Sequence, residues 1–213
     1  MFASLIPLQA GVLSGRHVRL EPLALHHLEG LTAIANGPRE TFTWTTLPAG
    51  VEPMRLYVAT AIALAEAGAA VPFATLDAVT GQVVGCTRFA NLEHCQLPVG
   101  DGRPAVRPWA VEIGWTWLAP HAQRTGINTE AKLLMLGHAF EQWGLGRVVL
   151  KTHQENARSR AAIERIGGQP DGFNRTHGPG GTTRPTAWYS LGVAEWPENK
   201  ARLLQRLAER ASK

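Results

Sequence analysis

The sequence predicts one α/β domain, built on a mixed and mostly antiparallel central sheet with helices on its faces. Three observations lead to this fold class. Segments with the periodicity of strands and of helices alternate along the chain. Two strands are separated by a turn at Thr80-Gly81, which is typical of an antiparallel hairpin. Two later strands flank a long apolar helix, and that order predicts a parallel pair. The length of 213 residues, 45% of them hydrophobic, suits one substantial core.

The N-terminal half is expected to form three strands and two helices. The first strand is expected at 16–22, where Val18 and Leu20 alternate with charged residues. The elements that follow are a helix over 26–35, a helix over 52–68, and hairpin strands over 71–78 and 82–92. The segment 98–108 holds three prolines and two glycines and is predicted to be a loop.

The C-terminal half begins with a strand over 110–118 that has a period of two. Its two faces are expected to carry Val111, Ile113, Trp115 and Trp117 on one side and Glu112, Gly114 and Thr116 on the other. A polar turn leads into a helix over 128–143, which is apolar on most of its circumference and therefore expected to be buried. The remaining elements are a strand over 147–152, a helix over 156–167, and strands over 168–176 and 182–191.

A C-terminal helix over 195–210 completes the domain. Its apolar stripe consists of Trp196, Lys200, Leu203, Leu204 and Leu207 and is expected to dock on the body. We expect a single domain over 1–213, with a core of about 16–192 and this helix packed against it. The amphipathic helix also offers a surface for a homodimer, and the oligomeric state stays open.

Charge and cysteine content narrow the class of protein. The formal net charge of +4 is spread along the chain without a basic run, so a nucleic-acid partner is not expected. Two cysteines cannot build a disulfide framework, which indicates a reducing compartment. No apolar run is long enough for a membrane helix, and the N-terminus is a poor signal peptide. We expect a cytoplasmic protein without a membrane partner.

The strand–turn–helix unit around Gln123–Asn128 is the strongest candidate for a binding site. A polar turn that opens a helix presents backbone N–H groups to an anion. Gly126 permits a positive φ or close approach of a ligand, and Asn128 tolerates left-handed geometry. Thr129 and Glu130 suit the first helical turn. The alternative is an ordinary loop that enters a helix.

This unit resembles the signature of the GNAT superfamily of acetyl-coenzyme A-dependent N-acyltransferases, Gln/Arg-x-x-Gly-x-Gly/Ala, with Asn128 in the last position. Further segments resemble the RimJ/RimL-like branch, in the right order: 146–152, Asn156-Ala157-Arg158-Ser159, 162–168, 188–191 and Glu195-Trp196-Pro197. A departure is Pro185, where the branch has an acidic residue. The resemblance covers roughly 16–207.

The resemblance implies a GNAT-like sheet whose central strands splay to form a cleft for acetyl-CoA. It also implies direct transfer of an acetyl group to a primary amine, of a protein N-terminus or of a small molecule, without a metal. The expected cofactor-binding residues are Thr116, Trp117, Leu118, Gln123, Arg124, Thr125, Gly126, Ile127, Asn128, Thr129, Asn156 and Ser159.

Three residues are candidates for proton transfer. Glu112 is the candidate general base, or else a charged residue on a half-exposed strand. Ser159 resembles the position that faces the thioester sulfur, and the alternative is a hydroxyl that satisfies a helix N-terminus. Tyr189 is the rival donor, or else a core residue with a bonded hydroxyl. No cysteine lies in the motifs, which disfavours a covalent intermediate.

Other interpretations stay in view. A non-catalytic acyl-CoA-binding module would use the same fold and the same turn. The acceptor amine is open between a ribosomal-protein N-terminus, another peptide, a polyamine and a small toxic amine. The pair His26-His27 and the run Glu93-His94-Cys95 lack the spacing of metal ligands, so no metal is expected.

Overall fold

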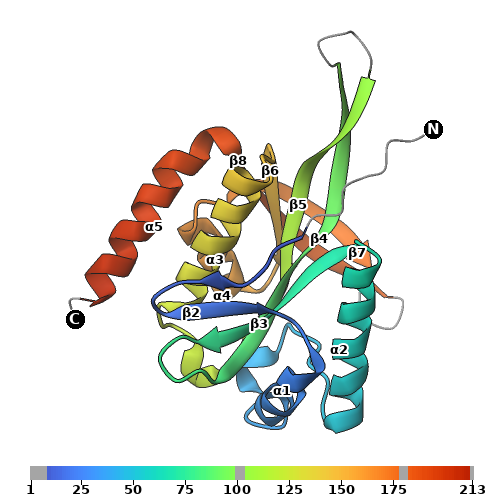
Figure 1. Cartoon of the computed structure of the whole chain (residues 1–213), viewed down its shortest axis with the longest axis vertical. Coiled ribbons are helices and arrows are strands. Elements are labelled where there is room, and N and C mark those ends of the chain that lie inside the picture. Colours follow the sequence, from blue (N-terminus) through green and yellow to red (C-terminus); the bar gives the residue numbers. More distant parts are fainter. Residues whose placement is uncertain (1–8, 99–103, 178–181, 212–213) are drawn as a thin grey trace.

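The computed structural model describes residues 9–98, 104–177 and 182–211. One eight-stranded sheet has the order β1-β2-β3-β4-β5-β6-β8-β7 (Figure 1). The strands are β1 (Leu13–Ser14), β2 (Val18–Pro22), β3 (Ala70–Asp77), β4 (Val83–Pro98), β5 (Pro104–Leu118), β6 (Arg147–His153), β7 (Gln169–His177) and β8 (Thr183–Gly192). Neighbouring strands are antiparallel except β5 and β6, which are parallel. This confirms the predicted mixed, mostly antiparallel sheet.

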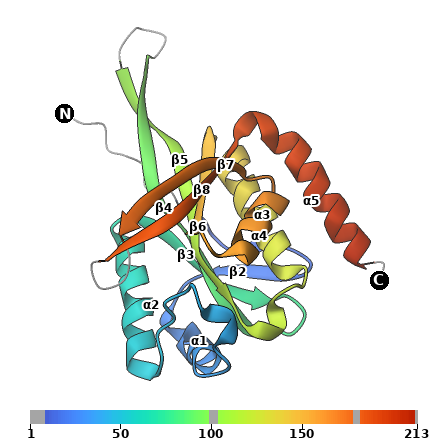
Figure 2. The same cartoon turned by 180° about the vertical axis from the view of Figure 1, so that it is seen from behind.

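Helices cover both faces of the sheet (Figures 1 and 2). They are α1 (Leu28–Ala35), α2 (Val51–Glu66), α3 (Ile127–Gly137), α4 (Ala157–Arg165) and α5 (Trp196–Ala211). The buried side chains of α1 and α2 share one hydrophobic cluster with β3 to β5, and those of α3, α4 and α5 belong to a second, larger one. Among the residues that the structure describes, no helix combines the length and apolarity required to cross a bilayer.

The two central strands diverge. β5 and β6 pair only through Ala110–Arg147, Val111–Val148 and Glu112–Val149, although β5 continues to Leu118 and β6 to His153. The expected splay of the middle strands is therefore present, and the edge of β5 that faces β6 has no paired strand beyond Glu112.

The segment predicted to be a loop, 98–108, is mostly strand, so that prediction was wrong. β4 runs through Pro98 and β5 starts at Pro104, with Leu97 opposite Ala105; residues 99–103 lie outside the described part. The two strands form an arm that projects from the body (Figure 1). Proline is tolerated there because each arm strand pairs on one side only, so a missing N–H need not break the ladder.

A bulge in β5 overturns the predicted division of its faces. Arg88 pairs with Gly114 and Cys86 with Trp117, so two residues of β5 lie opposite Thr87, and Trp115 has a φ of 50°. The extra residue reverses the alternation from that point on. Val111 and Ile113 remain in the larger core as predicted, whereas Trp117 is buried in the α1–α2 cluster. Thr116 instead bonds a side chain of α3.

The C-terminal helix docks on the body as expected. Trp196, Leu203 and Leu207 of α5 are buried, and Lys200 forms an ion pair with Glu141. Leu204, which was assigned to the same stripe, is half exposed. In both views α5 lies alongside α3 (Figures 1 and 2).

Candidate active site

The turn before α3 contains a left-handed residue, but not the expected one. Arg124 has a φ of 63°, whereas Gly126 has a φ of −71° and Asn128 lies within the helix. Gly126 is required for space instead, because a Cβ on it would lie 3.0 Å from Cδ2 of the His17 ring. The need for glycine thus arises from close approach of the chain itself.

The first turn of α3 offers backbone donors to an anion. The cap residue is Gly126, which has no side chain to accept from these N–H groups. Thr125 Oγ1 accepts from the N–H of Ile127 at 3.2 Å and donates to the carbonyl of Ala122 at 2.7 Å. The backbone N–H groups of this turn, together with the helix dipole, fit a phosphate group. Asn128 Oδ1 is buried without a partner among the described residues, but as an acceptor it does not pair with a phosphate oxygen.

Glu130 lies in the first turn of α3, as expected, and its carboxylate also binds a distant segment of the chain. Its carboxylate accepts from the backbone N–H groups of Arg16 at 3.0 Å, His17 at 2.6 Å and Val18 at 2.9 Å. Three charge-assisted bonds therefore hold the turn before β2 against the start of α3. This contact spans more than a hundred residues of sequence, so no local pattern could reveal it.

The N-terminus of α4 lies close to the same turn. Asn156 Oδ1 accepts from the N–H of Ser159 at 3.0 Å, so Asn156 caps this helix. Arg158 donates to Gln123 Oε1 at 3.0 Å, and Gln123 donates to the carbonyl of Leu118 at 2.9 Å. Gln123 thus ties the end of β5 to α4. Within the described residues the Ser159 hydroxyl has no partner.

Glu112 has two chemically different carboxylate oxygens. The side chain is 8% exposed. Its Oε2 accepts from Asn91 Nδ2 and forms an ion pair with Lys151 Nζ, both at 2.7 Å. Oε1 lies over Gly114, 3.0 Å from the position that a Cβ would take, and has no polar partner among the described residues. Lone pairs on Oε1 are therefore available to accept a proton.

The Tyr189 hydroxyl bonds neither Glu112 nor Ser159. It is 1% exposed, and its hydroxyl accepts from Arg160 Nε at 2.9 Å and donates to Glu164 Oε1 at 3.1 Å, both from α4. The hydroxyl thus joins β8 to α4. This geometry matches a core tyrosine with a bonded hydroxyl, and it favours Ser159 over Tyr189 as the donor.

The sequence reasoning missed Lys132. This lysine of α3 is 4% exposed, and its Nζ donates to Thr116 Oγ1 at 2.7 Å and to Thr87 Oγ1 at 3.1 Å. Burial lowers the pKa of Lys132 to about 7. The amine braces the bulge of β5 from the α3 side. The available signal was a lone charge within the apolar run that follows Glu130 in α3.

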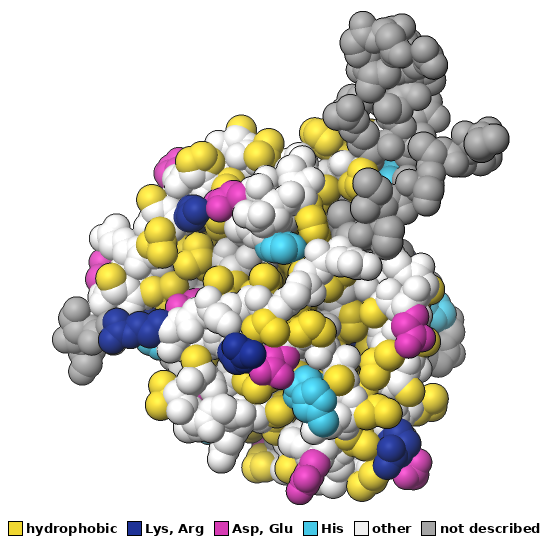
Figure 3. Space-filling model, viewed as in Figure 1, with side chains coloured by type: hydrophobic (Ala, Val, Ile, Leu, Met, Phe, Trp, Pro, Cys, Tyr) yellow, Lys and Arg dark blue, Asp and Glu magenta, His cyan; other side chains and the backbone are white. Residues whose placement is uncertain are grey.

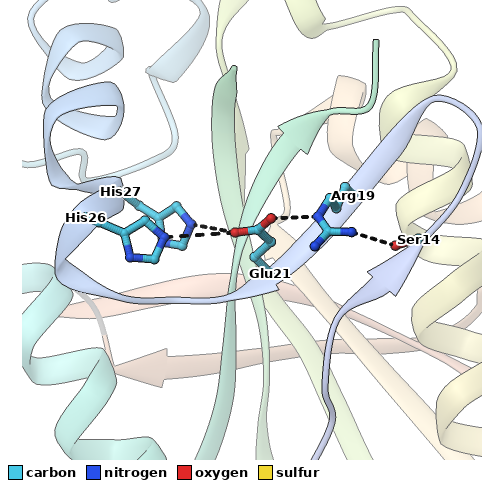
Figure 4. Close-up of polar contacts among 5 residues, drawn as sticks. All are labelled: Ser14, Arg19, Glu21, His26 and His27. Atoms are coloured by element: carbon cyan, nitrogen blue, oxygen red, sulfur yellow. Dashed lines mark hydrogen bonds and ion pairs between the residues drawn. The ribbon is translucent and has the colours of Figure 1, made fainter. Parts of the chain in front are cut away.

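A separate polar cluster sits where β2 ends (Figure 4). Glu21, His26 and His27 offer ligand atoms within 4.8 Å of one another. His27 Nδ1 accepts from the N–H of Ala24 at 3.1 Å, and Nε2 lies 3.3 Å from Glu21 Oε2. Glu21 Oε1 accepts from Arg19 Nε at 2.6 Å. Since protein groups engage both nitrogens of His27, the contacts account for the cluster as a structural network.

Comparison with known proteins agrees with this geometry. Residues 17–169 match the family model described as an acetyltransferase (GNAT) domain. YdaF of Bacillus subtilis (strain 168), provisionally named a ribosomal N-acetyltransferase, is 36% identical over 90 residues. That match covers 42% of this chain and only 49% of YdaF, about half the length of the relative.

Solved structures match over nearly the whole chain. A GCN5-related N-acetyltransferase from Brucella melitensis superposes with a TM-score of 0.80 at 29% identity, over 95% of this chain and 87% of that one. RimJ of Mycobacterium smegmatis, in complex with CoA-disulfide, has a TM-score of 0.73 at 22% identity, over 94% and 92% of the two chains.

The splayed sheet, the turn before α3 and the matched model define a class of enzyme. The chain belongs to the GNAT family of N-acetyltransferases. Its partial similarity to YdaF, which is named a ribosomal N-acetyltransferase, agrees with the RimJ/RimL-like branch that the motifs indicated.

Proposed function

We propose that this protein transfers the acetyl group of acetyl-CoA directly to a primary amine, of a protein N-terminus or of a small molecule. The observation that carries the proposal is the divergence of β5 and β6 beside the start of α3. An unpaired strand edge can hydrogen-bond an extended amide chain, and the adjacent helix start can bind phosphate. Acetyl-CoA combines these two features in one molecule.

The two substrates would approach from different sides of the gap. The pyrophosphate would lie on the first turn of α3 and the turn before it, with contacts from Gln123, Arg124, Thr125, Gly126, Ile127, Asn128 and Thr129. The pantetheine and the thioester would follow the backbone of Thr116, Trp117 and Leu118, with Asn156 and Ser159 on the far side. The amine would come from the α1–α2 face. Glu112 faces that side, because its neighbours Val111 and Ile113 belong to the larger core on the opposite face.

The reaction needs two proton movements. An ammonium with a pKa of about 8 to 10 has no free lone pair, so Glu112 Oε1, directly or through water, takes one proton and passes it to solvent. The amine nitrogen then attacks the thioester carbon, and the C–N bond forms as the C–S bond breaks. The nitrogen loses its second proton, and the thiolate takes up one proton to give the CoA thiol.

Ser159 is the proposed hydrogen-bond donor to the departing sulfur. Its N–H is held by Asn156, and its hydroxyl is free of other partners in the described part of the chain. A CoA thiol has a pKa of about 8.5, so its thiolate is a fair leaving group without full protonation. The serine therefore needs only to stabilise charge as it develops.

We propose no further cofactor and no nucleic-acid partner. On the face drawn in Figure 3 the Lys and Arg side chains lie apart from one another, without a continuous basic patch. Both cysteines of the chain, Cys86 and Cys95, are free thiols, which suits the reducing cytoplasm. Direct transfer by a single domain, as a monomer or a homodimer, completes the proposal.

The test is release of CoA thiol from acetyl-CoA in the presence of a panel of amines: N-terminal peptides, polyamines and amino acids. Release that depends on both an amine and this protein, with one acetyl group added per thiol, supports the proposal. Tight binding of acetyl-CoA without transfer to any amine would favour the alternative, an acyl-CoA-binding module of the same fold.

A further inference from the structure

Arg88 of β4 is a buried cation without an anionic partner. Its side chain is 5% exposed, and its guanidinium carbon lies 5.4 Å from the ring centre of Tyr57 and 4.9 Å from that of Trp115. Among the described residues, no carboxylate pairs with it and no atom accepts a hydrogen bond from it. Charged groups this deeply buried are ordinarily paired.

The two aromatic rings satisfy the guanidinium only in part. Rings interact with the faces of a guanidinium through their π-electrons. Its five N–H donors lie in its plane and are arranged as a fork that matches a carboxylate. Since neither ring supplies an acceptor, the site has an aromatic lining and an unused set of donors for an anion.

Arg88 is a near neighbour of the proposed general base. It is the cross-strand partner of Gly114, and the Glu112 carboxylate lies over that glycine. Trp115, which contacts the guanidinium, is 44% exposed and therefore accessible from solvent. Cross-strand neighbours and the next diagonal pair lie within about 8 Å of each other. An amine at Glu112 and an anion at Arg88 would thus be close enough to belong to one acceptor molecule, only a few atoms apart.

Two other cations near Glu112, Lys151 and Arg147 of β6, are already paired with carboxylates. Lys151 Nζ is held by Glu112 Oε2 at 2.7 Å and lies 3.8 Å from the centre of the Trp188 ring. Arg147, also on β6, pairs with Asp171 at 2.8 Å. Neither of these groups is free to bind an added anion without loss of an existing partner, in contrast to Arg88.

We propose that Arg88 recognises a carboxylate of the acceptor, placed a few atoms from the amine that is acetylated. This inference rests on the proposed function and narrows the acceptor to amines that carry such a carboxylate. The carboxylate belongs either to a free amino acid or to an acidic side chain at the N-terminus of a peptide. In both cases the guanidinium donates hydrogen bonds to a carboxylate, whose negative charge a neutral amide lacks. Polyamines have no carboxylate and are expected to be poor substrates.

The test compares acceptors that differ only in this carboxylate. One arm uses amidated tetrapeptides that begin with Asp or with Asn; the other uses a free amino acid or its amide. The wild-type protein should prefer the acidic member of at least one pair by about tenfold or more in kcat/KM, since charge-assisted bonds are strong. Equal rates within both pairs, or a preference for the amides, would overturn the inference.

Variants then assign the preference to Arg88. Arg88→Gln should lower kcat/KM for the acidic acceptor by about tenfold or more and leave the neutral one within about threefold. Arg147→Gln is the matched control, because its charge is already paired, and should preserve the preference. A preference that survives Arg88→Gln would contradict the assignment. If Arg88→Gln does not fold, Arg88→Lys, which keeps the charge but loses the fork, should retain part of the preference.

Binding separates this inference from the proposed function. The acidic acceptor should raise the melting temperature of the wild-type protein more than its amide does, and Arg88→Gln should remove that difference. If acidic ligands bind in this way but no amine is acetylated, the proposed function fails and the anion site stands. If amines are acetylated without regard to the carboxylate, the anion site fails and the proposed function stands.

Discussion

Glu112, the proposed general base, has one anchored carboxylate oxygen and one without a partner among the described residues. Oε2 is fixed by Asn91 and Lys151, while Oε1 is free of protein partners over Gly114. Glu112→Gln should lower kcat/KM by about a hundredfold, mainly at low pH, where more of the amine is protonated and a base is needed most. The pH–rate profiles of both proteins provide the measurement. An unchanged shape and height would make Glu112 a structural residue and leave deprotonation to a water chain.

The hydroxyls of Ser159 and Tyr189 differ in their hydrogen bonding: that of Tyr189 has two partners, and that of Ser159 has none among the described residues. Ser159→Ala should lower kcat by tens-fold, on the order of the effect of one proton donor, under saturating acetyl-CoA. Tyr189→Phe should leave kcat nearly intact and lower the free energy of unfolding by about 1 kcal/mol, because Arg160 and Glu164 lose a shared partner. The reverse pattern in kcat would assign the donor role to the phenol.

Lys132 links pH to stability. Burial lowers its pKa from 10.5 to about 7, so between these values the unfolded chain binds one more proton than the folded protein. Its contribution therefore makes stability rise as pH increases through this window, by up to about 1.4 kcal/mol per pH unit. Lys132→Met lacks this dependence. Relative to wild type, its free energy of unfolding should fall by about 2 kcal/mol from pH 7 to pH 9.

Urea unfolding of both proteins at pH 7 and pH 9 measures this difference. All other titrating groups are common to the two chains, so their contributions largely cancel. A constant difference between wild type and Lys132→Met would mean that the buried amine does not change its protonation on folding.

At the scale of elements, we propose that the turn and the start of α3 act as one anion-binding unit. Acetyl-CoA should raise the melting temperature of the wild-type protein, because it binds the native state. Gly126→Asp should abolish most of that rise by placing a carboxylate at the proposed pyrophosphate position. Gly126→Ala is the matched control, since its methyl group meets the His17 ring in the same way but brings no charge, and it should keep the rise. A full rise in Gly126→Asp would locate the phosphate site elsewhere.

Elements with a strong local pattern were predictable, and a change of pattern within an element was not. The alternation of residues 110–114 placed Val111 and Ile113 correctly in the core. The bulge at Trp115 was not visible, because a bulky aromatic side chain rarely adopts a positive φ and nothing local favours one there. Gly126 was likewise expected to permit a positive φ or close approach of a ligand, whereas its actual constraint is close approach of the His17 ring from the distant β1–β2 turn.

At the scale of the whole molecule, order along the chain predicted more than composition did. The helix between strands 110–118 and 147–152 required the parallel pairing that the structure contains. The arm of β4 and β5 was missed because its prolines and glycines are typical of loops. Only the folded structure reveals that Arg88 is unpaired and that Glu130 accepts hydrogen bonds from the start of β2, because both depend on residues far apart in sequence.

The central claim is direct transfer of an acetyl group from acetyl-CoA to an amine. The measurement that tests it most directly is a single-turnover reaction of the protein with acetyl-CoA, followed by thiol release and by mass analysis of protein and acceptor. We predict thiol release only when an amine is present, with equal amounts of acetylated acceptor and no acetyl group on the protein. Thiol release without an acceptor, with the acetyl group retained on the protein, would contradict the account.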